Sequence, residues 1–351
     1  MKWEDNVRKV IPYVPGEQPD EKNMIKLNTN ECPYPPAPEV AKAAAEMNVE
    51  KLRLYPNTEA APLRDALCKY YQVDKKQIFI GVGSDDVLAI AFLTFFNSEK
   101  PILFPDITYS FYDVWAELYR MPYKMQPLDE AFKIRKEDYM IPNGGIVLAN
   151  PNAPTGEQAD LSMIEEIIQN NQDSVVIVDE AYVDFGGVSA LPLIDKYDNV
   201  LVVQTFSKSR ALAGLRIGYA FGSEKLIQYM NDVKFSFNSY TMNMPSQILG
   251  AAAVTNDTYF KNIVEKMVNT RERVKVELKE LGFSFPDSKS NFIFATHPEY
   301  KAIDIKNMLL EKNIFVRHFN KERINNYLRI SIGTDEEMDT LIKELKSYMG
   351  K

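Results

Sequence analysis

The sequence contains few of the residues that build disulfide frameworks and metal centres. Its 351 residues include two cysteines, Cys32 and Cys68, and two histidines, His297 and His318. The cysteines are too far apart for a zinc or redox pair and too few for a disulfide framework, which favours a reducing, cytoplasmic setting. Two histidines leave little material for a metal site or a histidine-centred triad, so we expect no bound metal.

Long apolar runs and clusters of basic residues are also missing. The longest apolar run, residues 87–96, is too short to span a bilayer and is typical of a buried helix. Residues 1–9 are charged and lack the apolar centre of a signal peptide. A net charge of −8, a pI near 5.1 and the lack of any run of Lys or Arg argue against a nucleic-acid partner.

The pattern along the chain predicts an α/β protein. Helical patterns alternate with short apolar runs, which indicates a mainly parallel sheet covered by helices; the runs are residues 78–80, 101–104, 146–149, 175–178, 200–204 and 217–221. We expect a large domain over residues 41–255. Residues 256–351 predict a smaller α+β domain, in which a long charged helix over residues 259–281 stops at Gly282. Residues 1–40 are rich in proline and asparagine, which predicts an irregular arm that contributes to the small domain.

Lys208 is the most informative single residue. It follows the strand-like run 200–204 and stands in a polar stretch with Ser207, Ser209 and Arg216. A lysine in such a loop is most often a solvated surface residue. In a partly desolvated, cationic environment its pKa falls, however, and it becomes able to form an imine.

Two more motifs follow apolar strands. Asp179 ends a β-branched run, and an acid at that end of a buried parallel strand faces the crevice where α/β sheets bind ligands. Residues 81–86 read Gly-Val-Gly-Ser-Asp-Asp, so Ser84 and Asp85 open a helix whose N-terminus suits an anion. Asp86 stands where a dinucleotide fingerprint has its third glycine, which disfavours a nicotinamide dehydrogenase.

Together with the turn Asn-Pro-Asn-Ala-Pro-Thr-Gly at residues 150–156, these motifs resemble the fold-type I pyridoxal-phosphate aminotransferases. Among them the chain is similar to the histidinol-phosphate aminotransferases over essentially its whole length. The resemblance implies a fold-type I transferase that binds pyridoxal 5'-phosphate. It also implies interconversion of histidinol phosphate and 2-oxoglutarate with imidazole-acetol phosphate and glutamate, a step of histidine biosynthesis.

The resemblance also implies residue roles around the cofactor. Lys208 would form the imine and move the proton, Asp179 would pair with the ring nitrogen, and Tyr182 would donate to the ring oxygen. The expected cofactor contacts are completed by Ser84, Asp85, Ser207 and Arg216 at the phosphate, Tyr109 stacked on the ring, Tyr55 from the other subunit of a homodimer, and Asn152. Ala153 replaces the second asparagine of the familiar turn, which leaves open whether Asn152 bonds to the ring oxygen.

Five residues resemble the family's substrate contacts. Arg329 matches the arginine that binds the substrate anion, and a forked guanidinium can accept either a phosphate or a carboxylate. The others are Tyr13, Asn30, Arg317 and Tyr240, the last donated across a dimer with shared active sites.

Three other functions stay open at the level of sequence. A threonine-phosphate decarboxylase-like enzyme and an aromatic or aspartate-type aminotransferase would use the same cofactor residues. A noncatalytic ligand-binding relative would keep the fold and lose the lysine, whereas Lys208 is present.

Overall fold

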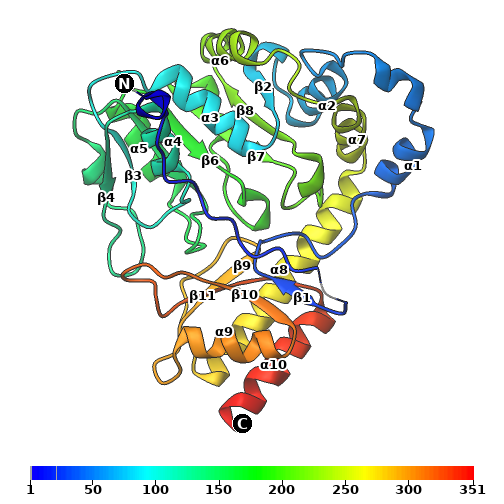
Figure 1. Ribbon diagram of the computed structural model, residues 1–351, viewed down its shortest axis with the longest axis vertical. Coiled ribbons are helices and arrows are strands. Elements are labelled where there is room, and N and C mark those ends of the chain that lie inside the picture. The colour runs from blue at the N-terminus through cyan, green and yellow to red at the C-terminus, as the bar shows by residue number, and fades with distance from the viewer. Residues whose placement is uncertain (1, 21) are drawn as a thin grey trace.

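The computed structural model describes residues 2–20 and 22–351. Its larger part is built on a seven-stranded sheet, seen above the smaller part in Figure 1. In spatial order the strands are β2 (Ile78–Gly81), β8 (Gly218–Gly222), β7 (Val200–Thr205), β6 (Val176–Asp179), β5 (Gly145–Ala149), β3 (Ile102–Pro105) and β4 (Tyr123–Gln126). Only β8 runs antiparallel to its neighbours, so the prediction of a mainly parallel sheet is confirmed.

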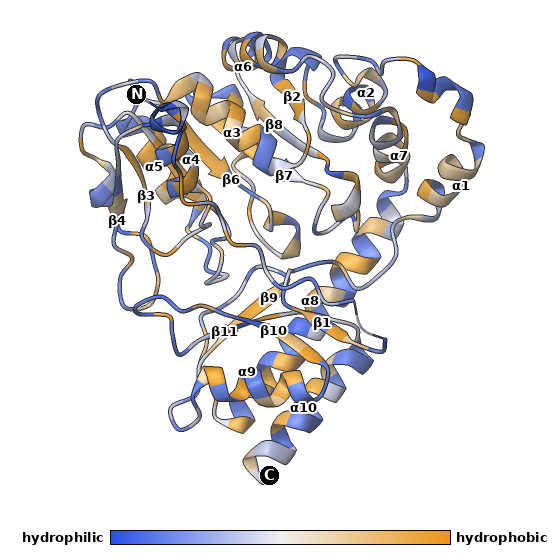
Figure 2. Ribbon diagram, in the orientation of Figure 1, coloured by the Kyte–Doolittle hydropathy of each residue, from blue (hydrophilic) through white to orange (hydrophobic). Residues whose placement is uncertain are grey.

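Helices cover both faces of this sheet. Successive side chains of a strand point to opposite faces, and the central strands β6 and β7 are buried at every position, so both faces must be covered. In β6, Val176 and Val178 pack with residues of α2, α5 and α7, while Ile177 packs with residues of α3, α4 and α6. Figure 2 shows β6 and much of α3 in the colour of hydrophobic residues. The helices of this part are α1 (Pro38–Glu46), α2 (Ala61–Tyr71), α3 (Ser84–Phe95), α4 (Tyr112–Tyr119), α5 (Leu161–Asn170), α6 (Glu224–Phe237) and α7 (Met244–Thr255).

The smaller part has a four-stranded sheet in the order β1 (Ile25–Leu27), β10 (Ile314–His318), β11 (Leu328–Ser331), β9 (Phe292–Ala295). It packs with α8 (Asp257–Leu281), α9 (Ala302–Glu311) and α10 (Asp335–Met349). The long α8 ends at Gly282, whose φ of 98° suits the left-handed cap of a helix. No helix in the described ranges is long and apolar enough to cross a membrane.

The N-terminal segment is more regular than the sequence predicted. Residues 25–27 form β1, which pairs in parallel with β10 through Ile25 and Ile314. Leu27 is buried in the core of the small domain, and its burial explains why a three-residue strand is held there. The N-terminal segment is therefore anchored to a sheet whose other strands come from the last third of the chain.

The direction of the strands positions the site. Parallel strands place their carboxyl ends along one edge of the sheet, and loops at that edge form the ligand crevice of α/β folds. Asp179 is the last residue of β6, and Lys208 follows the end of β7. Antiparallel β8 brings Gly218, at its amino end, to the same edge beside Gly81 of β2.

Candidate active site

Two adjoining cavities open at this edge, between the large sheet and the small one. The smaller, of about 170 Å3, is lined by Ser84, Asp85, Asp179, Ser207, Lys208 and Arg216 among others. The larger, of about 530 Å3, is lined by Tyr13, Asn30, Arg317 and Arg329 among others. Thr29, Tyr109, Ala153, Tyr182 and Lys208 line both. Most of the predicted cofactor residues thus line the smaller cavity and most of the predicted substrate residues line the larger one, and Lys208 is among the residues that line both.

Lys208 lies on a tightly bonded loop. The Thr205 hydroxyl accepts a hydrogen bond from the Ser207 amide at 3.1 Å, and the Phe206 amide donates to the carbonyl of Ile217 at 3.0 Å. The half-buried Lys208 ammonium donates to the Thr29 carbonyl at 3.3 Å, and it lies 5.7 Å from the centre of the Tyr182 ring. The rigid loop therefore presents one amine to both cavities.

Asp179 is a buried acid at the inner wall. Its carboxylate accepts hydrogen bonds from the Tyr112 hydroxyl at 2.8 Å and from the Ala181 amide at 3.2 Å. Burial raises the pKa of Asp179 to about 6, although both hydrogen bonds act in the opposite direction. A carboxyl with that pKa can share a proton with a basic ring nitrogen placed against it near neutral pH.

The opposite end of the small cavity suits a phosphate. Helix α3 begins at Ser84 with no side-chain cap, so its first amides and its dipole face the cavity. The Arg216 guanidinium lies at the same end and donates to Asp85 at 3.0 Å. A Cβ on Gly83 would lie 2.4 Å from Nη2 of Arg216, and a Cβ on Gly218 would lie 2.2 Å from the Gly83 carbonyl carbon. Gly218 is therefore required by the close approach of two backbone segments, whereas Gly83 is favoured by its φ of 85°, which side chains rarely adopt.

Two tyrosines flank the small cavity. The Tyr109 hydroxyl donates to Asp85 at 2.7 Å, and burial is the main reason that the pKa of Tyr109 is raised. The Tyr182 hydroxyl accepts a hydrogen bond from the Asn30 amide at 2.9 Å. Asn30 also accepts from the Ser331 hydroxyl at 2.9 Å, so the Tyr182 hydroxyl is held by a bond that reaches into the small domain.

The wall of the larger cavity carries two arginines from neighbouring strands. Arg317 of β10 and Arg329 of β11 are directly opposite each other in the antiparallel register. Arg329 donates to the Asn28 carbonyl at 3.0 Å, while its Nε is buried without a partner among the described residues. Burial lowers the pKa of Arg329, and neither arginine forms a salt bridge within the described ranges. Two unpaired guanidinium groups beside a cavity suit an anion.

Three of the predicted site residues do not line either cavity. The Asn152 side chain donates to the Ile107 carbonyl at 2.9 Å and accepts from Thr108 at 2.7 Å, so it is engaged within the protein while Ala153 faces the cavity. Tyr55 and Tyr240 are 79% and 46% exposed, and their rings lie against each other in a tilted arrangement with centres 4.5 Å apart.

Sequence reasoning did not single out several residues of the site. Tyr112, the first residue of α4, donates to Asp179, and the centre of the Phe319 ring lies 5.5 Å from the guanidinium carbon of Arg329. Glu31 lines the small cavity and accepts a hydrogen bond from the Thr29 hydroxyl at 2.6 Å. Phe319 lies one residue beyond the end of β10 and has no signal of its own in the sequence.

Pyridoxal phosphate fits the chemistry of the small cavity. A phosphate would lie at the start of α3 beside Ser84, Ser207 and Arg216, and a pyridine nitrogen would face Asp179. Lys208 and Tyr182 line the space between these two ends. The geometry defines the site of a fold-type I pyridoxal-phosphate enzyme.

Known proteins agree with this class. Residues 22–345 match the family model for aminotransferase class I and II. A histidinol-phosphate aminotransferase of Lactococcus lactis subsp. cremoris is 54% identical over 349 residues, which cover 99% of this chain and 98% of that protein. One from Brachyspira hyodysenteriae is 51% identical over 343 residues, 97% of each chain. The solved histidinol-phosphate aminotransferase of Sinorhizobium meliloti, in complex with pyridoxal-5'-phosphate, shares the fold with a TM-score of 0.85 at 24% identity, covering 93% of this chain and 91% of that one.

The protein is therefore a pyridoxal-phosphate-dependent aminotransferase. The chain belongs to the aminotransferase class I and II family, and its full-length relatives place it among the histidinol-phosphate aminotransferases.

Proposed function

We propose that this enzyme transfers the amino group of L-histidinol phosphate to 2-oxoglutarate and so forms imidazole-acetol phosphate and glutamate. The observation that carries the proposal is the position of Arg317 and Arg329. These two arginines line the same cavity as Lys208, and neither has a carboxylate partner in the described ranges. Relatives that are about half identical over the full length carry the name of this activity.

Pyridoxal phosphate supplies, when bound, the electron sink that stabilises the negative charge left on the substrate carbon. We propose that the Lys208 amine would hold the cofactor and would act as the base and acid that moves the proton of that carbon. Asp179 would pair with the ring nitrogen and favour its protonated form, and the hydrogen bond from Tyr112 holds the carboxylate in place. The Tyr182 hydroxyl, fixed by Asn30, donates towards the ring oxygen.

The phosphate contacts are assigned from their position at the start of α3. We propose that Ser84, Asp85 through its backbone amide, Ser207 and Arg216 hold the cofactor phosphate, and that Tyr109 covers the ring. Asn152 is already bonded within its own turn, so we assign it the positioning of the Ile107–Thr108 segment that precedes Tyr109.

The two arginines explain how one site accepts two different substrates. Histidinol phosphate carries a phosphate and no α-carboxylate, whereas glutamate carries two carboxylates. A guanidinium can form paired hydrogen bonds with either anion. We therefore assign Arg329 and Arg317 to the anion of each substrate in turn, with Tyr13 and Asn30 on the facing wall.

A product assay separates this function from the decarboxylase alternative. With histidinol phosphate and 2-oxoglutarate we expect glutamate to form in step with the loss of 2-oxoglutarate. With threonine phosphate in place of histidinol phosphate we expect no release of carbon dioxide. Carbon dioxide from threonine phosphate, with no glutamate from histidinol phosphate, would overturn the proposal.

We further propose a homodimer in which each subunit completes the other's site. The support is the exposed pair Tyr55 and Tyr240, which lies outside the two cavities of its own chain and whose rings contact each other in a tilted arrangement. Exposed apolar side chains, including Val49 at 66% and Leu52 at 50%, lie just before it in η2 (Val49–Arg53). Such a patch is typical of a protein interface.

Mixed dimers test this sharing. We expect Tyr55→Ala and Lys208→Ala to be impaired alone, and a refolded equimolar mixture to regain about a quarter of the wild-type activity, because half of the dimers are mixed and each has one intact site. A mixture with no more activity than the average of its components would contradict shared sites. A mass of 40.2 kDa in solution, that of a single chain, would contradict the dimer itself.

We also propose a cytoplasmic location, on the grounds that Cys32 and Cys68 are both free thiols. Recovery of the aminotransferase activity in a membrane or extracellular fraction would contradict it.

A further inference from the structure

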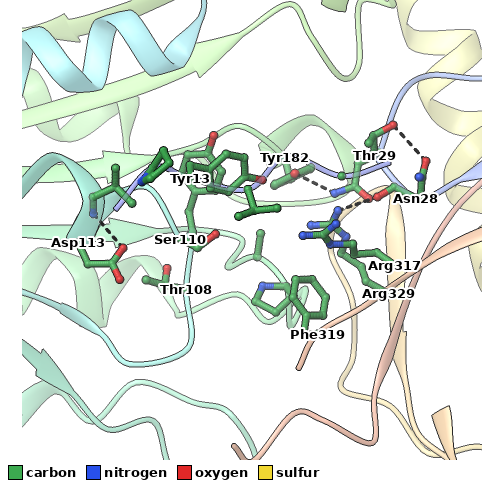
Figure 3. A pocket seen from close by; sticks show the side chains of 18 of the residues that line it. Tyr13, Asn28, Thr29, Thr108, Ser110, Asp113, Tyr182, Arg317, Phe319 and Arg329 are labelled. Carbon is green, nitrogen blue, oxygen red and sulfur yellow. Dashed lines mark hydrogen bonds between the residues drawn. The ribbon is translucent and has the colours of Figure 1, made fainter. Parts of the chain in front are cut away.

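The substrate cavity carries opposite charges at its two ends. Arg317 and Arg329 line one end, whereas Asp113 and Glu117 of α4 line the other. Figure 3 shows Asp113 together with Ser110 and Thr108 on the side of the cavity away from the two arginines. The proposed function uses the positive end and leaves the negative end without a role.

One carboxylate oxygen of Asp113 is available to accept a hydrogen bond from a ligand. One carboxylate oxygen accepts a hydrogen bond from the Val114 amide at 3.0 Å, and the other accepts none from the described residues. No salt bridge to Asp113 forms within the described ranges. The side chain is half-buried, and this burial is the main reason that the pKa of Asp113 is raised. A partly desolvated carboxylate with a free oxygen favours a donor from a ligand.

The shape of histidinol phosphate makes this end available to its ring. The amine-bearing carbon must lie at Lys208, and one methylene arm from that carbon carries the phosphate while the other carries the imidazole. If the phosphate binds the arginines, the imidazole must extend towards another part of the wall. Next to Asp113, the rings of Tyr13 and Phe111 stack with centres 4.1 Å apart, and Tyr13 presents an aromatic surface to the cavity.

We propose that Asp113 recognises the imidazole ring of histidinol phosphate by accepting its N–H, with Glu117 adding negative charge one turn further along α4. This inference rests on the proposed function and names the residue that selects its amino donor. The same two acids repel a carboxylate, so glutamate and 2-oxoglutarate are held through the arginine end. Asp113 thus favours a substrate with a nitrogen heterocycle over one with an acidic side chain.

A different role for Asp113 predicts a different result. Aspartate in the first turn of a helix also stabilises the helix dipole, and a residue with that role alone would affect both substrates equally. The two half-reactions share the cofactor, Lys208 and the fold, and they differ only in the substrate. Their ratio therefore separates recognition from stability.

The test is the variant Asp113→Asn, with kcat/KM of each half-reaction measured separately on the cofactor-loaded enzyme. We expect kcat/KM for histidinol phosphate to fall by about 10- to 100-fold, the range for loss of one hydrogen bond to a charged group. We expect kcat/KM for glutamate to stay unchanged or to rise. Glu117→Gln should shift the ratio in the same direction by less, because Glu117 is exposed and already accepts from the Tyr123 hydroxyl at 3.0 Å.

Asp173→Asn is the matched control, because it removes one negative charge from an exposed position that lines neither cavity, and neither half-reaction should change. Equal losses in both half-reactions, or an unchanged ratio in Asp113→Asn, would overturn the inference. A wild-type enzyme that fails to react with histidinol phosphate at all would instead overturn the proposed function, so the two failures are distinguishable.

Discussion

Replacing Lys208 with alanine is expected to lower kcat by at least about 10⁴-fold, because the proposed function assigns to this one side chain both the binding of the cofactor and the movement of the proton. No other lysine lines either of the two cavities in the described ranges, so no nearby amine can replace it. The measurement is glutamate formation from histidinol phosphate and 2-oxoglutarate at saturating concentrations.

The control for Lys208→Ala is Lys208→Arg, which keeps a positive charge near the Thr29 carbonyl and cannot act as a base near neutral pH. We expect it to be equally inactive. Both variants should still bind pyridoxal phosphate without a covalent bond, since Arg216 and the start of α3 are untouched. Retention of more than a few per cent of the wild-type rate by either variant would contradict the role assigned to Lys208.

Replacing Arg329 with methionine is expected to remove activity and to stabilise the protein. We expect kcat/KM for histidinol phosphate and for glutamate to fall by about 10²- to 10³-fold, because truncating one partner of a buried charged contact costs about 2–5 kcal/mol. The same guanidinium is buried with an unpaired Nε when no substrate is bound. Its removal should therefore raise the free energy of unfolding of the substrate-free enzyme by about 1 kcal/mol, after the loss of its bond to the Asn28 carbonyl.

The two changes in Arg329→Met are measured by half-reaction kinetics and by urea unfolding at matched cofactor content. Arg329→Lys is the control that keeps the charge but loses the forked geometry, so it should recover only part of the activity. A variant that lost activity and stability together would indicate a structural role for Arg329. A variant that kept its activity would show that the substrate anion binds elsewhere.

Much of the architecture follows from local sequence. The apolar runs that end at Asp179 and Gln204 are buried on both faces in the structure, and such runs are typical of central parallel strands. The edge strand β4 was not predicted, because its four residues include the exposed Lys124 and the polar Gln126 and so do not form an apolar run. The antiparallel direction of β8 also depends on its tertiary neighbours rather than on its own residues.

In the site, too, some residues could be placed from the neighbouring sequence, whereas others depend on how distant parts of the chain pack. Lys208 follows the end of β7, and Ser84 follows β2 and opens α3, as the order of apolar runs and polar residues in the sequence indicated. The pairing of Arg317 with Arg329 depends on the register of β10 and β11, and the bond from Tyr112 to Asp179 depends on the packing of α4. Neither contact has a local signal in the sequence. The placement of Asn152 away from the cavity likewise follows from its bonds to Ile107 and Thr108, which are distant along the chain.

The most direct test of the account is the visible absorbance of the purified enzyme, loaded with pyridoxal phosphate, before and after L-histidinol phosphate is added without any keto acid. We expect the band of the lysine-linked cofactor to disappear as the amino group is transferred, and to return when 2-oxoglutarate is added. A band that histidinol phosphate leaves unchanged would contradict the proposed substrate. A protein that cannot be loaded with pyridoxal phosphate would contradict the assignment of the site.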